Sequence, residues 1–162
     1  MQITMIAAIS SNGVIGVGNS PPWCIPEDLR YFKEYTAGKT IVLGYNTYKS
    51  IGSKPLPYRN NIVISSSFED STGVIKVCRS PLEALDYAKK RGVEELVIIG
   101  GSQIYKQMMP VADKLVITHV EVMSPYGVFF PEIKENMWRV DKLLGEGLSG
   151  GLEYEIKTYK RW

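Results

Sequence analysis

The chain has 162 residues, of which 44% are hydrophobic and 22% charged, and its formal net charge is +2. This length and composition are typical of one globular domain with a hydrophobic core of its own. Because the net charge is small and no run of Lys and Arg forms a basic patch, we expect no nucleic-acid partner, while small anionic ligands stay possible.

Apolar β-rich runs alternate with helical patterns along the chain. We expect strands at 2–10, 40–44, 61–66, 73–78, 95–100 and 114–122, and helices at 26–37, 45–51, 81–91 and 102–109. Continuous Val/Ile-rich strands separated by helices are typical of a parallel sheet covered on both faces. MWRVDKLLGE and LEYEIKTYKRW alternate instead, and predict an antiparallel hairpin with its turn near Gly145–Gly151.

The predicted fold is therefore a single α/β domain over residues 1–162. Its central sheet is mixed but mostly parallel, with about eight strands including the C-terminal hairpin, and about four helices flank it.

The start of the chain and its Cys and His content bound the expected compartment and chemistry. MQITMIAAIS has no basic n-region and is too short an apolar run for a membrane span, which favours a cytoplasmic protein without membrane contact. Cys24 and Cys78 have no metal or redox spacing, so free thiols are expected. His119 is the single histidine. We expect it to pack or face solvent rather than transfer protons, and we expect no metal site.

The helix predicted from Pro26 carries an acid on its apolar face. At about 100° per residue, Asp28 lies on the same face as Leu29 and Phe32, while Glu27 lies on the solvated face. A buried carboxylate costs several kcal/mol unless a partner compensates it, and this helix supplies none. Acids in a first turn also complement the helix dipole, but that does not explain an acid in the apolar stripe. Asp28 is a candidate ligand-binding group.

Three predicted strands end in glycine or serine. The strand at 40–44 ends at Gly44, the strand at 61–66 ends in Ser65 and Ser66, and the strand at 95–100 leads into Gly101 and a helix. Ligands of α/β sheets bind at the carboxyl ends of strands, where such turns offer backbone N–H groups to phosphates. No GxGxxG fingerprint is present, and a double glycine also serves close helix–strand packing. This edge is a candidate dinucleotide site.

Several blocks of the sequence together resemble dihydrofolate reductase along the whole chain, in order and spacing and with no large insertion. They are MIAAISSNGVIG (5–16), PPWCIPEDLRYFK (21–33), VLGYNTYKSIG (42–52), PLPYRNNIVISS (55–66), VIIGGSQIY (98–105), KLVITHVE (114–121) and FFPEI (129–133). The resemblance implies an enzyme that reduces 7,8-dihydrofolate to 5,6,7,8-tetrahydrofolate by hydride transfer from NADPH, and so supplies one-carbon metabolism and thymidylate and purine synthesis.

The resemblance assigns the catalytic roles to Asp28, Thr118 and Trp23. One carboxylate accepts hydrogen bonds from both the N3–H and the 2-amino group of the pterin, which places its C6 against the nicotinamide C4. Thr118 corresponds to the hydroxyl that bonds Asp28, although alone it is an ordinary strand threonine. Trp23 corresponds to the residue that holds a water beside the ring, and an aromatic staple is an equal alternative. The N5 proton is expected to arrive through water, with Asp28 either favouring the reactive tautomer or raising the basicity of the ring.

The resemblance also implies the remaining ligand contacts. Arg59 pairs with the α-carboxylate of the glutamate tail, and Lys54 lies at the rim of the same site. The substrate-binding residues implied are Ile6, Ala8, Asp28, Leu29, Phe32, Ile51, Lys54, Arg59, Ile99 and Thr118. The cofactor-binding residues implied are Ala8, Ile15, Gly16, Asn19, Ser20, Gly44, Tyr45, Asn46, Thr47, Ser65, Ser66, Arg79, Ile99, Gly100, Gly101, Ser102, Gln103, Ile104 and Tyr105.

Position 45 departs from the family pattern. Many relatives carry Arg or Lys there, which pairs with the 2′-phosphate that distinguishes NADPH from NADH, whereas this chain has Tyr45 followed by Asn46. Losing a charge-assisted bond of about 1.5–3 kcal/mol costs roughly ten- to a hundredfold in preference. Ser65, Ser66 and Arg79 are the residues available to compensate. We expect NADPH to be used with weakened discrimination against NADH.

Two loops also depart from the pattern. Pro21 and Pro22 precede Trp23, where proline fixes φ and removes a donor, so a stiffer loop is expected. Tyr126 and Gly127 stand where many bacterial relatives have Gly-Asp, whose Asp bonds the closed active-site loop. The usual switch between closed and occluded loops is therefore not expected.

A monomeric dihydrofolate reductase is the preferred hypothesis, and two alternatives stay open. One is a related pyridine-nucleotide reductase for another pterin or a pyrimidine, against which Asp28 and Arg59 argue. The other is a folate-binding or assembly component without activity, against which Asp28, Thr118 and the double-glycine turn argue together.

Overall fold

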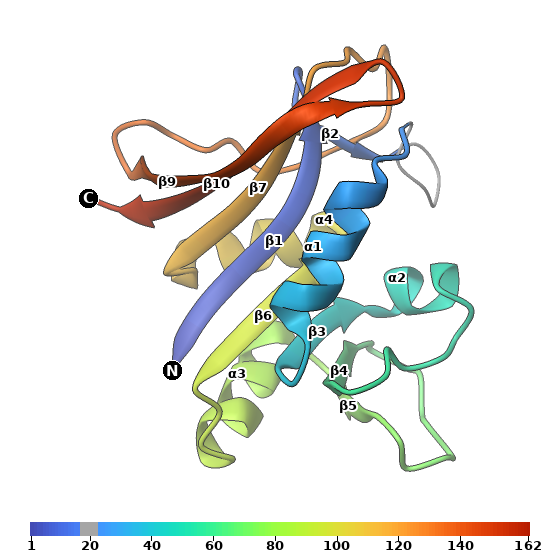
Figure 1. Cartoon of the computed structure of the whole chain (residues 1–162). Coiled ribbons are helices and arrows are strands. Elements are labelled where there is room, and N and C mark those ends of the chain that lie inside the picture. Colours follow the sequence, from blue (N-terminus) through green and yellow to red (C-terminus); the bar gives the residue numbers. More distant parts are fainter. Residues whose placement is uncertain (17–22) are drawn as a thin grey trace.

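The computed structural model describes residues 1–16 and 23–162. Its main sheet has eight strands in the order β5-β4-β3-β6-β1-β7-β10-β9 (Figure 1). The parallel strands are β1 (Gln2–Ser10), β3 (Thr40–Gly44), β4 (Asn60–Ile64), β5 (Lys76–Cys78), β6 (Glu95–Gly100) and β7 (Lys114–Val120). The antiparallel strands are β9 (Trp138–Ser149) and β10 (Leu152–Arg161). The prediction of a mostly parallel sheet with an antiparallel C-terminal hairpin is confirmed.

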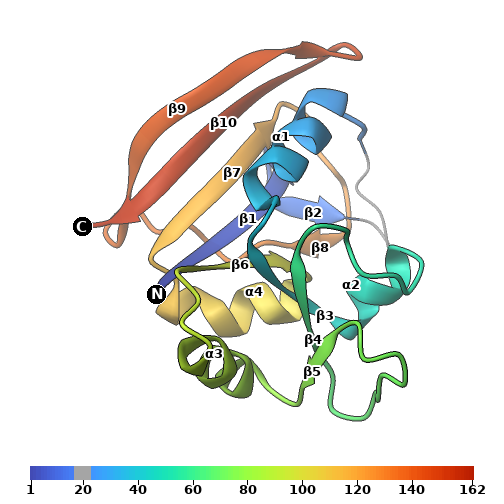
Figure 2. The same ribbon diagram turned by 60° about the horizontal axis from the view of Figure 1, so that its bottom comes forward.

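Helices cover both faces of this sheet. They are α1 (Pro26–Thr36), α2 (Tyr45–Ser50), α3 (Pro81–Lys90) and α4 (Ser102–Met108), followed by the 3-10 turn η1 (Met109–Val111). Figure 2 shows α1 on one side of the sheet and α3 and α4 on the other. The four predicted helices are confirmed, each ending one residue earlier than expected.

Alternate residues of each strand serve the two layers. Met5, Leu115 and Ile117 belong to the core cluster that includes residues of α3 and α4. Ile6 and Val116, their neighbours along the strands, belong to the cluster against which residues of α1 and α2 pack. This alternation follows from the period of two in a β-strand. It also places Thr118 on the α1 side of the sheet and His119 on the other.

Four predicted strand boundaries were wrong. β7 ends at Val120 rather than at residue 122, and the other three have local reasons. β4 ends at Ile64 because the Ser65 hydroxyl accepts the N–H of Phe68 at 2.9 Å and turns the chain. β5 spans only Lys76–Cys78, since Asp70 holds a turn by accepting the Gly73 N–H at 2.9 Å. The hairpin turn is confined to residues 150 and 151, which have φ of 58° and 82°, so the earlier glycines of the predicted turn lie within β9.

Two short strands were not predicted. β2 (Val14–Gly16) pairs with β8 (Val128–Phe129) in a separate two-stranded sheet. Strands of three and two residues give no alternation that could be read from the sequence.

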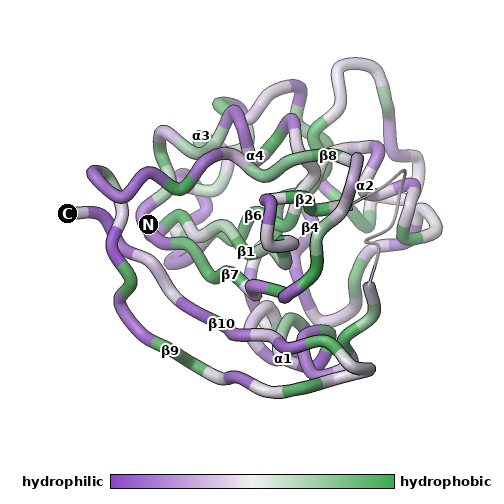
Figure 3. Tube along the Cα trace, turned by 90° about the horizontal axis from the view of Figure 1, so that it is seen from above, coloured by the Kyte–Doolittle hydropathy of each residue, from purple (hydrophilic) through white to green (hydrophobic). Residues whose placement is uncertain are grey.

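The outer hairpin differs in character from the central strands. Figure 3 shows hydrophobic colour concentrated along the central strands, while β9 and β10 are largely hydrophilic with isolated apolar positions. Since β9 is the edge strand of the sheet, this pattern is typical of a strand with one neighbour and much solvent contact.

A polar cluster fixes the C-terminal half of α1 on the sheet. Tyr35 donates to Glu95 Oε2 at 2.6 Å, Thr4 donates to the same oxygen at 2.6 Å, and Lys39 Nζ lies 3.0 Å from Oε1. These contacts tie the helix to β1 and β6. They leave the first turn of α1 to be positioned by β7 and the loop before the helix.

Among residues 1–16 and 23–162, no helix is both long and apolar enough to cross a membrane. The same part of the chain holds no group of three or more His, Cys, Asp or Glu side chains arranged for a metal ion.

Candidate active site

Asp28 in the first turn of α1 meets Thr118 near the end of β7. The buried Thr118 hydroxyl donates to Asp28 Oδ1 at 2.5 Å, joining residues 90 positions apart. Burial raises the pKa of Asp28 above its ordinary value, and the hydrogen bond from Thr118 opposes that rise. The partner that α1 could not supply therefore comes from the sheet.

The strand and loop around Asp28 bring several predicted residues together. Ala8 on β1 is the register partner of Thr118 on β7. Ala8 also packs against a buried cluster that contains Trp23 and Val120. A second cluster joins Ile6 with Phe32 and Ile99. Thus the predicted substrate residues of β1, α1, β6 and β7 gather on the α1 side of the sheet.

Two predicted apolar contacts remain largely exposed. Leu29 is 55% exposed and Ile51 is 38% exposed, whereas Trp23 is 9% exposed. Lys54 is also exposed. Leu29 follows Asp28 directly in α1, so the carboxylate and an exposed apolar side chain lie at the same helix turn. This combination suits a ligand with both hydrogen-bond donors and a flat apolar ring.

The expected position of Glu27 was wrong. Glu27 is half-buried rather than solvated, and its Oε2 is buried with no hydrogen-bond partner among the described residues. Hydrogen bonds from its own backbone and from Ser149 hold the pKa of Glu27 below its ordinary value. The end of the β9–β10 hairpin thus reaches the first turn of α1, a contact that helical periodicity does not reveal.

Tyr105 has a structural contact that the sequence did not indicate. It is 4% exposed, and its hydroxyl donates to the carbonyl oxygen of Ile6 at 2.7 Å. Burial, with a smaller effect from the Asp28 charge, raises the pKa of Tyr105. Its hydroxyl is therefore used to hold β1 beside Asp28, while the resemblance had placed the residue in the cofactor site.

The turns after β3 and β6 lie side by side. Leu43 and Gly100 are register partners, and the Gly44 and Gly101 caps of α2 and α4 have no side-chain hydrogen bond. A Cβ on Gly101 would lie 3.1 Å from Thr47 Oγ1, and Gly100 has a φ of 128°. Glycine is thus required at both positions, because one needs left-handed geometry and the other needs close approach.

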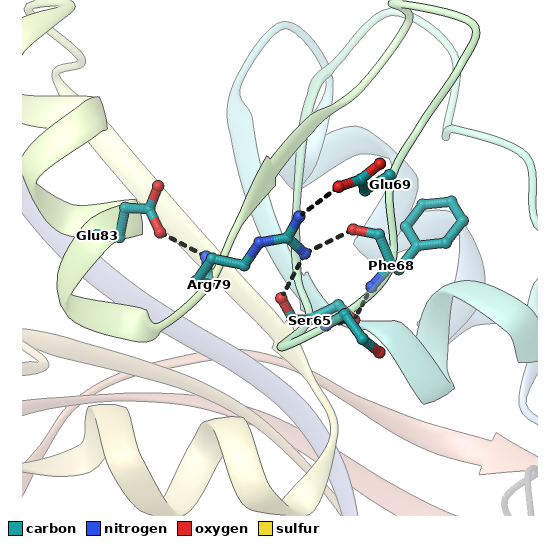
Figure 4. Close-up of polar contacts among 6 residues, drawn as sticks. Ser65, Phe68, Glu69, Arg79 and Glu83 are labelled. Carbon is teal, nitrogen blue, oxygen red and sulfur yellow. Dashed lines mark hydrogen bonds and ion pairs between the residues drawn. The ribbon is translucent and has the colours of Figure 1, made fainter.

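Arg79 is surrounded by acceptors (Figure 4). Its Nη1 donates to the carbonyl oxygens of Ser65 at 3.1 Å and Phe68 at 2.6 Å, and its Nη2 lies 3.7 Å from Glu69 Oε1. Its backbone N–H donates to Glu83 Oε2 at 2.5 Å. The side chain of Arg79 fastens the segment 65–69 to the start of α3.

The predicted residues Tyr45 and Ser65 are linked through Phe68. The Tyr45 and Phe68 rings stack with centroids 4.5 Å apart and planes at 21°. The Ser65 hydroxyl accepts the Phe68 N–H at 2.9 Å. The turn after β3 and the loop after β4 therefore form one continuous surface. Neither Phe68 nor its stacking was indicated by the sequence, because the pairing joins a helix start to an irregular loop.

Arg59 lies against the C-terminal end of α1. Its Nε donates to Thr36 Oγ1 at 2.7 Å and its Nη1 donates to the Pro57 carbonyl at 2.9 Å. Partial burial lowers the pKa of Arg59. The guanidinium is therefore held in place on the same helix that carries Asp28.

The remaining predicted residues are placed in part. Ile15 and Gly16 lie on β2, where Ile15 packs against the core. Asn19, Ser20 and the Pro21-Pro22 pair lie outside the described residues. Tyr126 is 68% exposed, and its carbonyl accepts the Ser124 hydroxyl at 2.7 Å. The carbonyl oxygen of Ser124 in turn accepts a hydrogen bond from Asn12 Nδ2 at 2.7 Å.

His119 lies on the face of the sheet away from Asp28. Its Nε2 is 2.6 Å from the Tyr159 hydroxyl, and burial holds its pKa below the ordinary value. Both residues line an open cavity of about 710 Å³ that contains none of the residues predicted for the substrate. Convergent polar groups around Asp28, rather than the size of a cavity, identify the candidate site.

The chain is similar to named dihydrofolate reductases over its whole length. The family model described as "Dihydrofolate reductase" matches residues 2–161. A dihydrofolate reductase of Neisseria gonorrhoeae is 46% identical over 139 residues, covering 86% of this chain and 85% of that one. One of Neisseria meningitidis serogroup B is 41% identical over 163 residues, covering 100% and 99%.

A solved structure agrees with the sequence relatives. The dihydrofolate reductase from Enterococcus faecalis complexed with NADP(H) and RAB-propyl superposes with a TM-score of 0.88 at 34% identity, covering 99% of this chain and 96% of that one. The fold and the family expected from the sequence are both confirmed.

Proposed function

The chain belongs to the dihydrofolate reductase family and reduces 7,8-dihydrofolate with NADPH, and on this premise we propose that Asp28 is its pterin-binding group. The observation that supports the proposal is the half-buried Asp28 carboxylate with Oδ1 bonded to Thr118. A single carboxylate matches the paired N3–H and 2-amino donors of a pterin, since charge-assisted bonds to two donors are strong and directional.

Asp28 binds and orients the ring, and Thr118 positions the carboxylate. With the ring fixed by these residues, NADPH bound beside it would supply the hydride for C6 of the pterin. Holding two reacting atoms in line lowers the barrier through orientation alone. A water beside Trp23 brings the proton to N5, and the negative charge of Asp28 favours the protonated ring.

The rest of the substrate has contacts along α1 and the neighbouring loop. Arg59 binds the α-carboxylate of the glutamate tail, because its guanidinium is already fixed by Thr36 and Pro57. Lys54 lies at the rim. Leu29, Phe32 and Ile51 line the apolar slot for the ring and the benzoyl group, and the backbone carbonyls of Ile6 and Ile99 lie near the pterin and the nicotinamide.

The residues present fit NADPH. The adjoining turns at Gly44 and Gly101 have no side-chain cap, and such turns suit phosphate groups. Thr47 on α2 lies close to Gly101. We assign the cofactor to these turns together with Ala8, Ile15, Gly16, Ser65, Ser66 and the segment 102–105. Because Tyr45 replaces a cation, we propose that preference for NADPH over NADH is weaker than in relatives with Arg or Lys at this position.

We further propose that residues 1–162 act as a single-domain monomer in the cytoplasm and bind no nucleic acid. A net charge of +2 without a basic run supports the last point.

The test of the Asp28 role is the dihydrofolate-dependent loss of NADPH absorbance for the wild type and Asp28→Asn. Asn keeps the shape but replaces one acceptor by a donor, so two charge-assisted bonds of about 1.5–3 kcal/mol each are lost or reversed. We expect kcat/KM to fall by about 10²- to 10⁴-fold. Glu27→Gln, in the same helix turn, is the matched control and retains most activity. Unchanged activity in Asp28→Asn would refute the role.

A further inference from the structure

The side chain of Arg79 already makes contacts within the protein. Two of its contacts are to the carbonyls of Ser65 and Phe68, and a third is to the Glu69 carboxylate at 3.7 Å (Figure 4). A guanidinium has five donors in a fixed plane. With Nη1 directed at two carbonyls and Nη2 3.7 Å from a carboxylate, the Arg79 guanidinium is oriented toward the loop after β4.

Ser65 is likewise hydrogen-bonded within the protein. It is 8% exposed, its hydroxyl accepts the Phe68 N–H, and its carbonyl accepts Arg79. Ser66, the next residue, is exposed. Of the residues expected to compensate for Tyr45, Ser65 and Arg79 thus hold the loop after β4, with the Arg79 side chain still 44% exposed, while Ser66 is exposed.

Lys49 is the cation that remains beside Tyr45. It lies on the last turn of α2, four residues after Tyr45, and its Nζ is 4.9 Å from the centroid of the Tyr45 ring. It is exposed, and within residues 1–16 and 23–162 it forms no ion pair. Residues four apart on a helix lie on one face, so the ammonium lies beside the Tyr45 ring.

Because of the charges around this surface, Lys49 determines whether a phosphate group is attracted to it. Glu69 offsets Arg79, and Asp70, which hydrogen-bonds Thr72 and Gly73, is close enough to α2 that its charge raises the pKa of Tyr48. The loop at 65–75 carries Glu69 and Asp70 and no Lys or Arg of its own, so without Lys49 the surface shared by this loop and α2 would be more negative than positive. A dianionic phosphate would be repelled there, while a ribose hydroxyl would not.

Resting on the cofactor site proposed above, we propose that Lys49 recognises the 2′-phosphate of NADPH, and that Arg79 is a positioning residue for the loop at 65–69. Lys49 acts from above the Tyr45 ring, and the exposed Ser66 offers a further hydroxyl donor. An ammonium is a point charge without the two-pronged geometry of arginine. The preference for NADPH is therefore retained but smaller than a guanidinium at position 45 would give.

The test is direct binding of adenosine 2′,5′-bisphosphate and adenosine 5′-monophosphate by calorimetry. The wild type is expected to bind the bisphosphate more tightly, and Lys49→Met to reduce that ratio by about 5- to 50-fold, the range for losing a partly exposed charge-assisted contact. Binding of the monophosphate stays within about twofold. Lys49→Arg restores the ratio, and the wild-type ratio falls with added salt more steeply than that of Lys49→Met.

Two further variants test whether the effect is specific to Lys49, one at a distant lysine and one at Arg79. Lys142→Met removes a lysine from β9, at the opposite edge of the sheet from β5, and leaves both affinities unchanged. Arg79→Met loosens the loop and weakens both nucleotides to a similar degree, as a positioning role requires. If Lys49→Met leaves the affinity ratio intact, or Arg79→Met alone abolishes it, the proposal is wrong.

Kinetics distinguish this proposal from the proposed function. If Lys49→Met lowers kcat/KM with NADPH but not with NADH, both stand. If both cofactors are affected equally while dihydrofolate is still reduced, only the role of Lys49 fails. A wild type that reduces no dihydrofolate with either cofactor would overturn the proposed site itself.

Discussion

The hydrogen bond between Thr118 and Asp28 can be removed with little change of shape. Thr118→Val replaces the hydroxyl by a methyl group, and since Thr118 is 3% exposed the new side chain fills the same buried space. The Asp28 Oδ1 then loses a donor 2.5 Å away. A hydrogen bond to a charged group contributes about 1.5–3 kcal/mol, and we therefore expect kcat/KM for dihydrofolate to fall by about 10- to 150-fold.

The same substitution has a second, independent readout. Burial raises the pKa of Asp28 and Thr118 opposes it, so Thr118→Val raises that pKa further. A carbon-13 NMR titration of the Asp28 carboxyl in the free enzyme measures the shift directly. A pKa raised in the folded state makes the protonated form more favourable, so the variant loses stability relative to wild type as the pH rises through the folded pKa of Asp28.

Two controls test the reasoning. Thr118→Ser keeps the hydroxyl and is expected to retain most activity and the wild-type pKa of Asp28. In an Asp28→Asn background, Thr118→Val should have little further effect on kcat/KM, because the two residues act as one unit. If Thr118→Val changes neither the pKa of Asp28 nor kcat/KM, the hydrogen bond does not position the carboxylate.

Three other substitutions have distinct expected outcomes. Arg59→Lys loses the bond to Thr36 and should raise KM for dihydrofolate by about tenfold with kcat nearly unchanged, an effect absent with dihydropteroate, which has no glutamate tail. Tyr105→Phe leaves the buried Ile6 carbonyl without its donor and should lower the free energy of unfolding by about 1–3 kcal/mol in urea denaturation. Burial lowers the pKa of His119 from 6.5, so stability at that site is complete above this value and is lost as the pH falls through the depressed pKa. His119→Gln should flatten that part of the stability profile and leave turnover unchanged, and a loss of turnover would contradict its placement away from the site.

The central strands could be predicted because burial on both faces leaves a strong trace in the sequence. TIVLG and ELVIIG are continuous apolar runs, and β3 and β6 have the predicted bounds. Boundaries failed where a side chain competes with the strand hydrogen bonds, as the Ser65 hydroxyl does after Ile64. A serine in this position looks the same in the sequence whether it continues a strand or ends one.

The candidate site was predictable in its key residue but not in its contacts. Periodicity placed Asp28 apart from Glu27, yet both are half-buried, and their difference lies in what they meet. Asp28 meets a hydroxyl from β7, whereas Glu27 meets Ser149 at the end of the β9–β10 hairpin. Helical spacing determines a direction from the helix axis, and only the fold determines which strand or hairpin lies there.

In the proposed cofactor site, one contact joins residues close in the sequence and could be predicted, while another depends on the fold. Tyr45 and Lys49 are four residues apart in a predicted helix, so their proximity could have been inferred from the sequence. The contacts of the Arg79 guanidinium could not have been inferred, since they depend on how the irregular segment from Ser65 to Glu69 folds back on β5. A missing cation at one position is therefore weak evidence for lost specificity until the neighbouring charges, and what each already binds, are placed in space.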